Sequence, residues 1–278
     1  MIKIVTDSSS DLSKELIDQY GISVVPLYSR FGENVYKERV DITDDQFYQK
    51  MAESDTLPVT ILPSPGDFVP VYEKLLKEAD TIVSIHLSSK LSGTMNSAIQ
   101  AKASLGDNPK IHIIDSTVVS IALGLIVLSA AKTAKEGGTL EQVIATANEA
   151  IKDTAPVCLL DSLKNLQKGG RIGKATALIG SLLNVKPLIT MKNGEVVPFG
   201  KARSRSKGMD MIVEHVSKFK QIEDMAIAWS TTPDDAKALS ERIAPYFKKG
   251  EVKIVRLGTT LGVHTGAGTI VVSVRGKL

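Results

Sequence analysis

The chain has 278 residues, of which 43% are hydrophobic and 23% are charged, a composition typical of folded globular proteins. Its 34 basic and 31 acidic residues leave a net charge of +3, and only 5% of the residues are aromatic, which argues against binding of DNA or RNA. A length of 278 residues favours two domains over one.

Three further features of the sequence concern the compartment of the protein. The single cysteine, Cys158, lies in an apolar run and allows no disulfide within the chain, so it is expected to be an inert core thiol. The first residues lack the pattern of a signal peptide, and we expect a cytoplasmic protein. The longest apolar segment, Val118 to Ala131, is too short to cross a bilayer and is expected to form a buried helix without stable membrane insertion.

In the first 155 residues the predicted strands alternate with helices. The segment Thr56 to Pro65 carries three prolines and is expected to be irregular. Predicted strands are Ile2–Val5, Ile22–Tyr28, Thr81–Leu87 and Lys110–Ile114, and predicted helices end near Tyr20, Ser54, Ala79, Leu105, Lys135 and Lys152. This alternation predicts an α/β domain over residues 1–155, with a mostly parallel sheet covered on both faces.

From residue 156 the pattern changes to an α+β domain, which we expect to span residues 156–278. Asn193 and Gly194 separate two short apolar runs and predict an antiparallel hairpin. Predicted strands are Val157–Leu160, Leu188–Met191, Glu195–Phe199, Met225–Trp229, Val252–Val255 and Thr269–Val274. Predicted helices are Leu163–Gln167 and Ser206–Phe219, together with one that runs through Leu183 and one that starts at Thr232–Asp234. Predicted loops are Gly169–Gly173 and Gly258–Gly268.

The segment Thr81 to Ala98 has the strongest functional pattern, because a buried strand ends there in hydroxyl groups and turns directly into a helix. Ser88, Ser89, Ser92, Gly93 and Thr94 would present hydroxyls and free N–H groups at the carboxyl edge of the sheet, where open α/β sheets bind ligands. A small anionic group fits this place. The alternative is that Ser92 only caps the following helix.

Motifs for several enzyme classes are missing. The run from Gly169 to Lys174 has lysine and alanine where a Walker phosphate loop needs glycine and a hydroxyl residue, and no dinucleotide-binding glycine pattern follows the first strand. His86, His112, His215 and His264 lack the spacing of metal ligands, so neither a metal nor a cofactor is expected. A stand-alone serine hydrolase using Ser92 with His264, or a small-molecule kinase, therefore stays an alternative without a supporting motif.

Two further segments allow a functional and a simpler interpretation. Glycines surround His264 and Thr265 and could bring the backbone and an imidazole close to a bound group, although a histidine in a loop is commonly just solvated. Lys201, Arg203, Arg205 and Lys207 form a basic cluster that could either be solvated or dock an acidic partner.

Over its whole length the sequence resembles the DegV family, the bacterial fatty-acid-binding proteins that serve as the lipid carrier subunit of fatty acid kinase. Ile61, Leu62 and Ala267 depart from the family pattern, in which a polar pair and a proline are usual. The resemblance rests on IVTDSSSDL near the start, TILPSP at Thr60–Pro65, SSKLSGTMNSA at Ser88–Ala98, IIDS at Ile113–Ser116, GGRIG at Gly169–Gly173 and HTGAG at His264–Gly268.

This resemblance implies a two-domain protein that holds a long-chain fatty acid in an apolar tunnel between or beneath the domains and has no catalytic residue of its own. By motif position, Thr60 and Ser92 would hold the carboxylate, while Arg171 and His264 would act on the phosphate side after a separate ATP-dependent kinase has formed the acyl phosphate. Arg203 would contact that kinase. The complete predicted ligand-binding set is Thr60, Ser92, Gly93, Arg171, His264 and Thr265.

Overall fold

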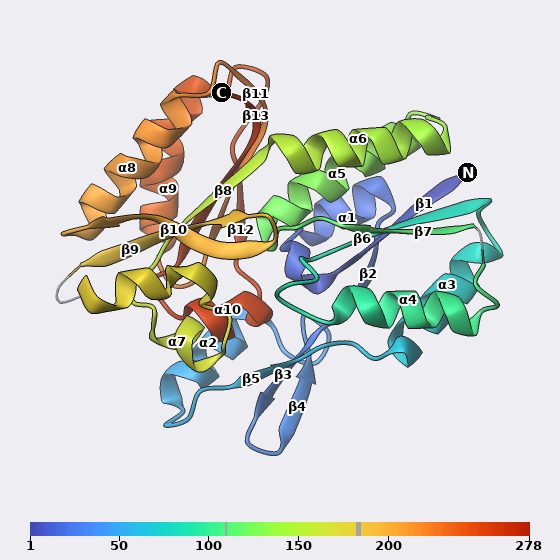
Figure 1. Cartoon of the computed structure of the whole chain (residues 1–278), viewed down its shortest axis with the longest axis horizontal. Coiled ribbons are helices and arrows are strands. Elements are labelled where there is room, and N and C mark those ends of the chain that lie inside the picture. Colours follow the sequence, from blue (N-terminus) through green and yellow to red (C-terminus); the bar gives the residue numbers. More distant parts are fainter. Residues whose placement is uncertain (109, 182–184) are drawn as a thin grey trace.

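A computed structural model describes residues 1–108, 110–181 and 185–278, and within these ranges the strands form three sheets (Figure 1). The first sheet has the order β2-β1-β6-β7, and all of its strands are parallel. In β6 only Thr81 is not fully buried, because helices cover both faces of this sheet. Its strands are β1 (Ile2–Asp7), β2 (Ser23–Val25), β6 (Thr81–His86) and β7 (Ile111–Asp115).

Helices α3 and α4 pack on one face of the parallel sheet, and α5 packs on the other with α1 beside it. The start of α3 agrees with the sequence, since Ser64 and Asp67 form a capping box around Pro65 at the first helical position. The helices of this half are α1 (Lys14–Tyr20), α3 (Pro65–Leu76), α4 (Thr94–Ser104), α5 (Ile121–Lys135) and α6 (Leu140–Asp153), with a 3₁₀ turn at Ser8–Ser10.

The second sheet has the order β10-β9-β8-β13-β11-β12, and every neighbouring pair is antiparallel except β11 with β12. The predicted hairpin is confirmed, since β9 and β10 pair across Asn193 and Gly194. Helices α8 (Arg205–Ser217) and α9 (Pro233–Ile243) cover one face, and α5 with α6 packs against the other (Figure 1). The strands are β8 (Thr154–Leu159), β9 (Lys186–Lys192), β10 (Glu195–Ala202), β11 (Gln221–Trp229), β12 (Lys253–Arg256) and β13 (Ile270–Lys277), and a 3₁₀ turn at Ala244–Tyr246 follows α9.

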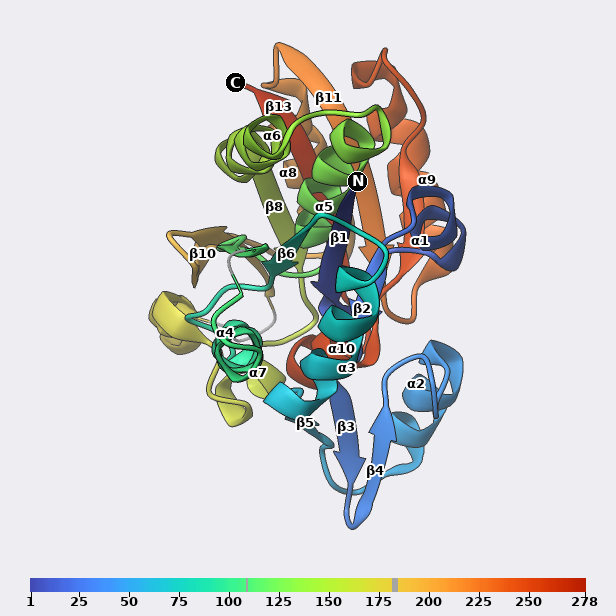
Figure 2. The ribbon, with the colours of Figure 1, turned by 90° about the vertical axis from the view of Figure 1, so that its right-hand side faces the viewer.

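A third, antiparallel sheet, β4-β3-β5, lies below the rest of the molecule in Figure 2, and the sequence analysis did not predict it. The single strand expected over Ile22–Tyr28 is wrong: β2 ends at Val25, and Tyr28 begins a strand of the other sheet. Pro26 lies at the break, where it has no N–H to donate to a ladder. This sheet consists of β3 (Tyr28–Phe31), β4 (Asn34–Lys37) and β5 (Val59–Ile61), and α2 (Asp44–Glu53) connects β4 to β5.

Three expectations about irregular segments need correction. The segment Thr56–Pro65 is not wholly irregular, because it contains β5. The segment Gly258–Gly268 is not a loop, because Thr259–Thr265 forms α10. After α7 (Lys164–Lys168), the chain forms a 3₁₀ segment, Gly173–Ser181, in place of the predicted helix, whose expected end at Leu183 lies outside the described residues.

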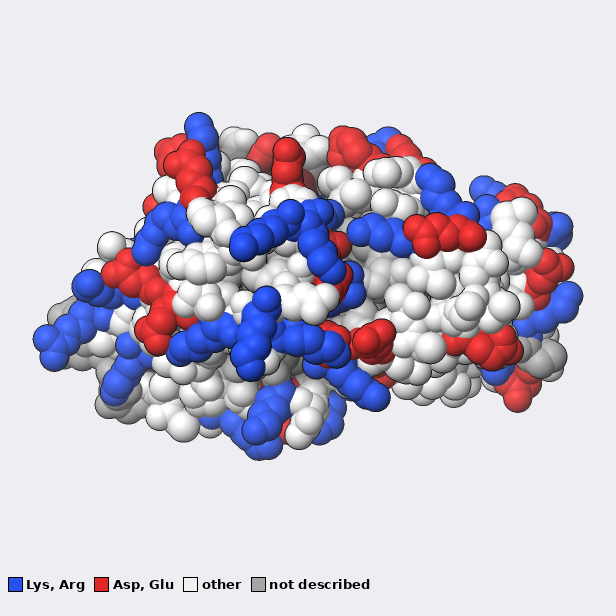
Figure 3. All heavy atoms as spheres, turned by 90° about the horizontal axis from the view of Figure 1, so that it is seen from above, with Lys and Arg blue, Asp and Glu red and all other residues white. Residues whose placement is uncertain are grey.

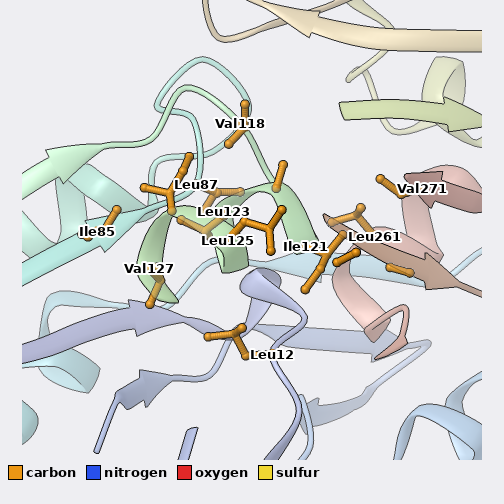
Figure 4. Close-up of a cluster of buried hydrophobic side chains, with 14 of the residues drawn as sticks. Leu12, Ile85, Leu87, Val118, Ile121, Leu123, Leu125, Val127, Leu261 and Val271 are labelled. Atoms are coloured by element: carbon orange, nitrogen blue, oxygen red, sulfur yellow. The ribbon is translucent and has the colours of Figure 1, made fainter. Parts of the chain in front are cut away.

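Helix α5 is the centre of the core. It is buried continuously from Ile121 to Ala131, as expected for a helix that is apolar on all sides. Figure 4 shows its side chains between Leu87 of the parallel-sheet half, Leu261 of α10 and Val271 of β13. One hydrophobic cluster therefore extends from the first sheet to the second.

Charges of both signs are mixed on the surface. In the view from above, Lys and Arg side chains gather in the middle of the face, with Asp and Glu side chains among and beside them (Figure 3). Ion pairs such as Lys277–Asp153 at 2.6 Å and Arg242–Asp210 at 2.8 Å partly neutralise the basic groups. Such exposed pairs contribute little to stability.

Candidate ligand-binding site

A largely apolar cavity lies where the two halves of the chain meet. The volume of this cavity that the centres of water molecules can occupy is about 120 Å³. Strands β8, β9, β10 and β13 form one side, and segments that follow β2, β6 and β7 form much of the other. Its apolar lining consists of Leu27, Leu62, Leu87, Leu91, Val119, Pro156, Cys158, Leu166, Ile189, Met191, Val196, Leu261 and Val271.

Five of the six predicted ligand-binding residues line this one cavity, namely Thr60, Ser92, Arg171, His264 and Thr265. They come from four separate segments: β5, the turn before α4, the loop after α7, and α10. Arg171 is exposed, as is the neighbouring lining residue Leu62, while Thr265 is buried. The fold therefore brings these five residues together in the wall of one largely apolar cavity.

Two predicted residues do not line the cavity. Gly93 begins α4 beside it, and a β-carbon there would meet the Leu62 side chain at 3.5 Å. Arg203 is exposed in the bend between β10 and α8. Its neighbour Arg205 is not part of a free basic cluster, because its guanidinium bonds to the Gly268 carbonyl at 2.6 Å and pairs with Asp235.

His264 is held tightly at the polar end of the cavity. Its Nε2 and the Thr60 hydroxyl form a hydrogen bond of 3.0 Å, while its buried Nδ1 has no hydrogen-bond partner among the residues that the structure describes. Burial and, to a smaller extent, the Arg171 charge lower the pKa of His264 to about 4, so the imidazole is neutral at pH 7. A β-carbon at residue 169 would lie 2.9 Å from Cε1 of His264, so glycine is required for this close approach.

The Ser92 hydroxyl both lines the cavity and supports the start of α4. It accepts a hydrogen bond from the Thr94 N–H at 3.3 Å and lies 2.9 Å from the Thr94 hydroxyl. Both interpretations of this residue from the sequence are therefore compatible with its position. Ser92 and His264 are not hydrogen-bonded to each other, so the geometry provides no nucleophile–base pair at these two residues.

Arg171 lies at the exposed rim of the cavity. Its Nε donates to the Leu91 carbonyl at 3.2 Å and its Nη1 to the Gly169 carbonyl at 2.6 Å. These two bonds orient the guanidinium, and its remaining N–H groups can meet an anion at the cavity opening.

The sequence analysis missed a fully buried polar chain in the first half. Asp7 Oδ2 lies 2.9 Å from His86 Nδ1, and Ser84 Oγ lies 2.7 Å from His86 Nε2 and 2.9 Å from the Tyr72 hydroxyl. These residue types resemble a catalytic triad, but none of the four side chains lines the cavity and all are fully buried. Asp7 also accepts from the Leu87 N–H at 3.1 Å, so the network fixes the end of β6.

Most of the apolar lining was also missed, since no motif marks it. Cys158 was predicted to be an inert core thiol, and it is buried in the cavity wall, where burial raises its pKa to about 12. Among the residues the structure describes, no three His, Cys, Asp or Glu side chains are grouped to bind a metal ion. Likewise, no described helix has the length and apolar character required to span a bilayer.

The model of the DegV family, which is described as an uncharacterised protein family, matches residues 1–277. The chain belongs to the DegV family. Protein DegV of Bacillus subtilis is 34% identical over 274 residues, which cover 97% of each chain. The sequence-based assignment to this family is therefore confirmed.

Solved structures show the same fold. A DegV family protein from Thermus thermophilus, described with fatty acid binding, has a TM-score of 0.92 and 35% identity over 99% of both chains. DegV of Bacillus subtilis, described as a fatty acid binding protein, has a TM-score of 0.88 and 32% identity over 99% of both. A stearic acid-binding protein from Eubacterium ventriosum has a TM-score of 0.91 and 28% identity, covering 99% of this chain and 98% of that one. The predicted fold class, a parallel α/β sheet followed by a mixed-sheet half, is confirmed.

Proposed function

We propose that this protein binds a long-chain fatty acid in the cavity and presents its carboxylate to a separate ATP-dependent kinase. The observation that carries the proposal is the convergence of Thr60, Ser92, Arg171 and His264 on one largely apolar cavity. The fatty acid binding described for the similar structure from Thermus thermophilus, and the stearic acid named for that from Eubacterium ventriosum, support the binding part of the proposal.

The acyl chain supplies the affinity in this proposal. Removing roughly 15 methylene groups from water at about 0.8 kcal/mol each contributes on the order of 12 kcal/mol, before the costs of association and ordering. A lipid of this kind stays bound without a covalent link. The wall suits the hydrocarbon because most of its lining residues are apolar.

The carboxylate would lie at the polar end, near the hydroxyls of Thr60 and Ser92. Hydrogen bonds from hydroxyls replace those that the carboxylate made to water, so they orient the ligand more than they strengthen binding. Such an orientation points the reactive group toward the opening beside Arg171, where a kinase could reach it.

Arg171 and His264 would act on the phosphate side, and Arg203 would contact the kinase on the surface. A dianionic acyl phosphate has more charge and more acceptor oxygens than a carboxylate, and the guanidinium of Arg171 suits them. The protein itself would be a carrier rather than an enzyme. We expect it to work in the cytoplasm, where a kinase finds ATP.

Calorimetric titration of the lipid-free protein with oleate tests the binding step, with one site per chain expected. Acyl phosphate formation on adding the kinase and ATP tests the presentation step. No heat of binding with oleate or palmitate would refute the first step, and equal acyl phosphate formation with and without this protein would refute the second.

A further inference from the structure

Helix α10 carries His264 and Thr265, yet its first turn is held from the other half of the chain. Asp11 Oδ1 accepts a hydrogen bond from the Gly258 N–H at 2.9 Å, and Glu38 Oε1 accepts one from the Thr260 N–H at 3.0 Å. The Thr260 hydroxyl donates to Glu38 Oε2 at 2.8 Å. Both carboxylates are 1% exposed, so these bonds form away from water.

The same two carboxylates hold other parts of the cavity wall. The Ser120 hydroxyl donates to Asp11 Oδ2 at 2.6 Å, and Ser120 lines the cavity. The Ser8 hydroxyl donates to Glu38 Oε2 at 2.5 Å and accepts from the N–H of Leu27, another lining residue, at 2.9 Å. Each carboxylate thus connects the start of α10 to a second wall segment.

Two backbone features show how closely this region is constrained. Ser120 has φ 65° and ψ −155°, a conformation that costs a non-glycine residue energy and persists only where surrounding contacts enforce it. A β-carbon at residue 258 would lie 2.7 Å from Asp11 Oδ1 and would also collide with Glu38 Oε1. Glycine is therefore needed for both carboxylates to reach the first turn of α10.

We propose that Asp11 and Glu38 are positioning residues of the candidate site, which set through α10 where His264 and Thr265 lie in the cavity. The proposal rests on the proposed function for its effect on lipid affinity. That effect is expected to act through Leu261 and Thr265, which α10 contributes to the cavity wall, whereas loss of the His264 ring alone leaves oleate binding nearly unchanged. The effect on the positions of His264 and Thr265 can be tested on the lipid-free protein alone.

The role of Asp11 can be tested separately from that of Glu38, because the charge of the Asp11 carboxyl group depends on pH. Burial raises the pKa of Asp11 to about 7, although Arg39 and the Ser120 hydroxyl oppose this effect. As a carboxylate, Asp11 accepts charge-assisted bonds from Gly258 and Ser120, which are stronger than bonds to a neutral acid. Its hold on α10 is therefore stronger at pH 8 than at pH 6.

The other charged groups around Asp11 come from three elements. Glu38 and Arg39 follow β4, Asp44 is the first residue of α2, and Arg39 Nη2 is 3.7 Å from Asp11 Oδ1. Strand β12 contributes Arg256, and α1 contributes Lys14 and Asp18, which pair with each other at 2.7 Å. These groups and Asp11 line a second hollow.

The test compares Asp11→Asn, Glu38→Gln and the control Asp224→Asn with the wild type. Asp224 is equally buried but bonds to Lys132 and Lys253, away from the cavity lining. The dissociation constant for oleate is measured at pH 6 and pH 8. Asp11→Asn should weaken binding by about three- to tenfold at pH 8 and hardly at all at pH 6, and Glu38→Gln should weaken it by a similar factor at pH 8.

Nitrogen NMR of the histidine side chains in the lipid-free proteins supplies the second readout, with the His264 signals assigned by loss in His264→Gln. Asp11→Asn and Glu38→Gln should both shift these signals, and Asp224→Asn should not. Unmoved His264 signals in correctly folded Asp11→Asn and Glu38→Gln would overturn the positioning role, as would a pH-independent effect of Asp11→Asn on binding. A wild type that binds no oleate would instead refute the proposed function, while the NMR comparison would still decide the geometry.

Discussion

His264 Nε2 lies 3.0 Å from the Thr60 hydroxyl, although the two residues are 204 positions apart in the chain. The bond joins α10 to β5 at the polar end of the cavity, and Figure 2 shows α10 directly above the three-stranded sheet that contains β5. His264 Nδ1 is buried and has no partner within residues 1–108, 110–181 and 185–278, so protonation of this ring is disfavoured.

We therefore predict a pH-dependent stability difference between the wild type and His264→Gln. Burial lowers the pKa of His264 to about 4 in the folded protein, from about 6.5 in the unfolded chain. The contribution of the neutral ring to the free energy of unfolding is therefore fully present above pH 6.5 and is lost as the pH falls toward 4. At roughly 1.4 kcal/mol per pKa unit, the wild type should lose about 3 kcal/mol relative to the variant across this range. Urea unfolding at several pH values measures the difference, and a constant difference would contradict the prediction.

Ser92→Ala should weaken fatty acid binding by roughly 1 kcal/mol, because one hydrogen bond to the carboxylate is lost. A small loss of stability should accompany it, since Thr94 loses a partner at the start of α4. Ser89→Ala is the matched control, because the Ser89 hydroxyl bonds to Asp115 and does not line the cavity. Calorimetry with oleate measures both variants, and an equal effect in the two would argue against a contact between Ser92 and the ligand.

Arg171→Ala and His264→Ala should bind fatty acid nearly normally but lose most acyl phosphate formation with the kinase and ATP. The reason is that they are proposed to meet the phosphate, which is absent until the kinase has acted. Lys168→Ala serves as a control, since Lys168 is exposed nearby at the end of α7 and does not line the cavity. A parallel loss of oleate affinity in Arg171→Ala and His264→Ala would show that this division of roles is wrong.

Arg203→Ala should also reduce acyl phosphate formation, but through weaker docking of the kinase. Raising the kinase concentration should restore its rate, whereas Arg171→Ala and His264→Ala should not recover. Lys201→Ala provides a comparison with an exposed basic neighbour. A deficit in Arg203→Ala that persists at saturating kinase would place the residue outside the docking surface.

The alternation of strands and helices allowed most of the fold to be predicted, because buried parallel strands such as β6 and capped helices such as α3 have strong local patterns. The third sheet was missed because its strands have only three or four residues each and depend on pairing with one another. Local sequence carries little information about such pairing. The division into domains at residue 155 stays a prediction.

Helix α10 shows why part of the site could not be predicted from local sequence. Its glycines indicated a loop, but the first turn is held by Asp11 and Glu38, more than 200 residues earlier in the chain. The family motifs still selected five residues that line one cavity. The apolar wall lacks a motif, because many combinations of aliphatic side chains can fill it.

Native mass spectrometry of the protein after gentle isolation from a bacterial host tests the central claim most directly. The account predicts a mass increased by one long-chain fatty acid per chain, and uptake of one palmitate or oleate by protein that has first been stripped of lipid. A bare mass together with no uptake of either fatty acid would contradict it.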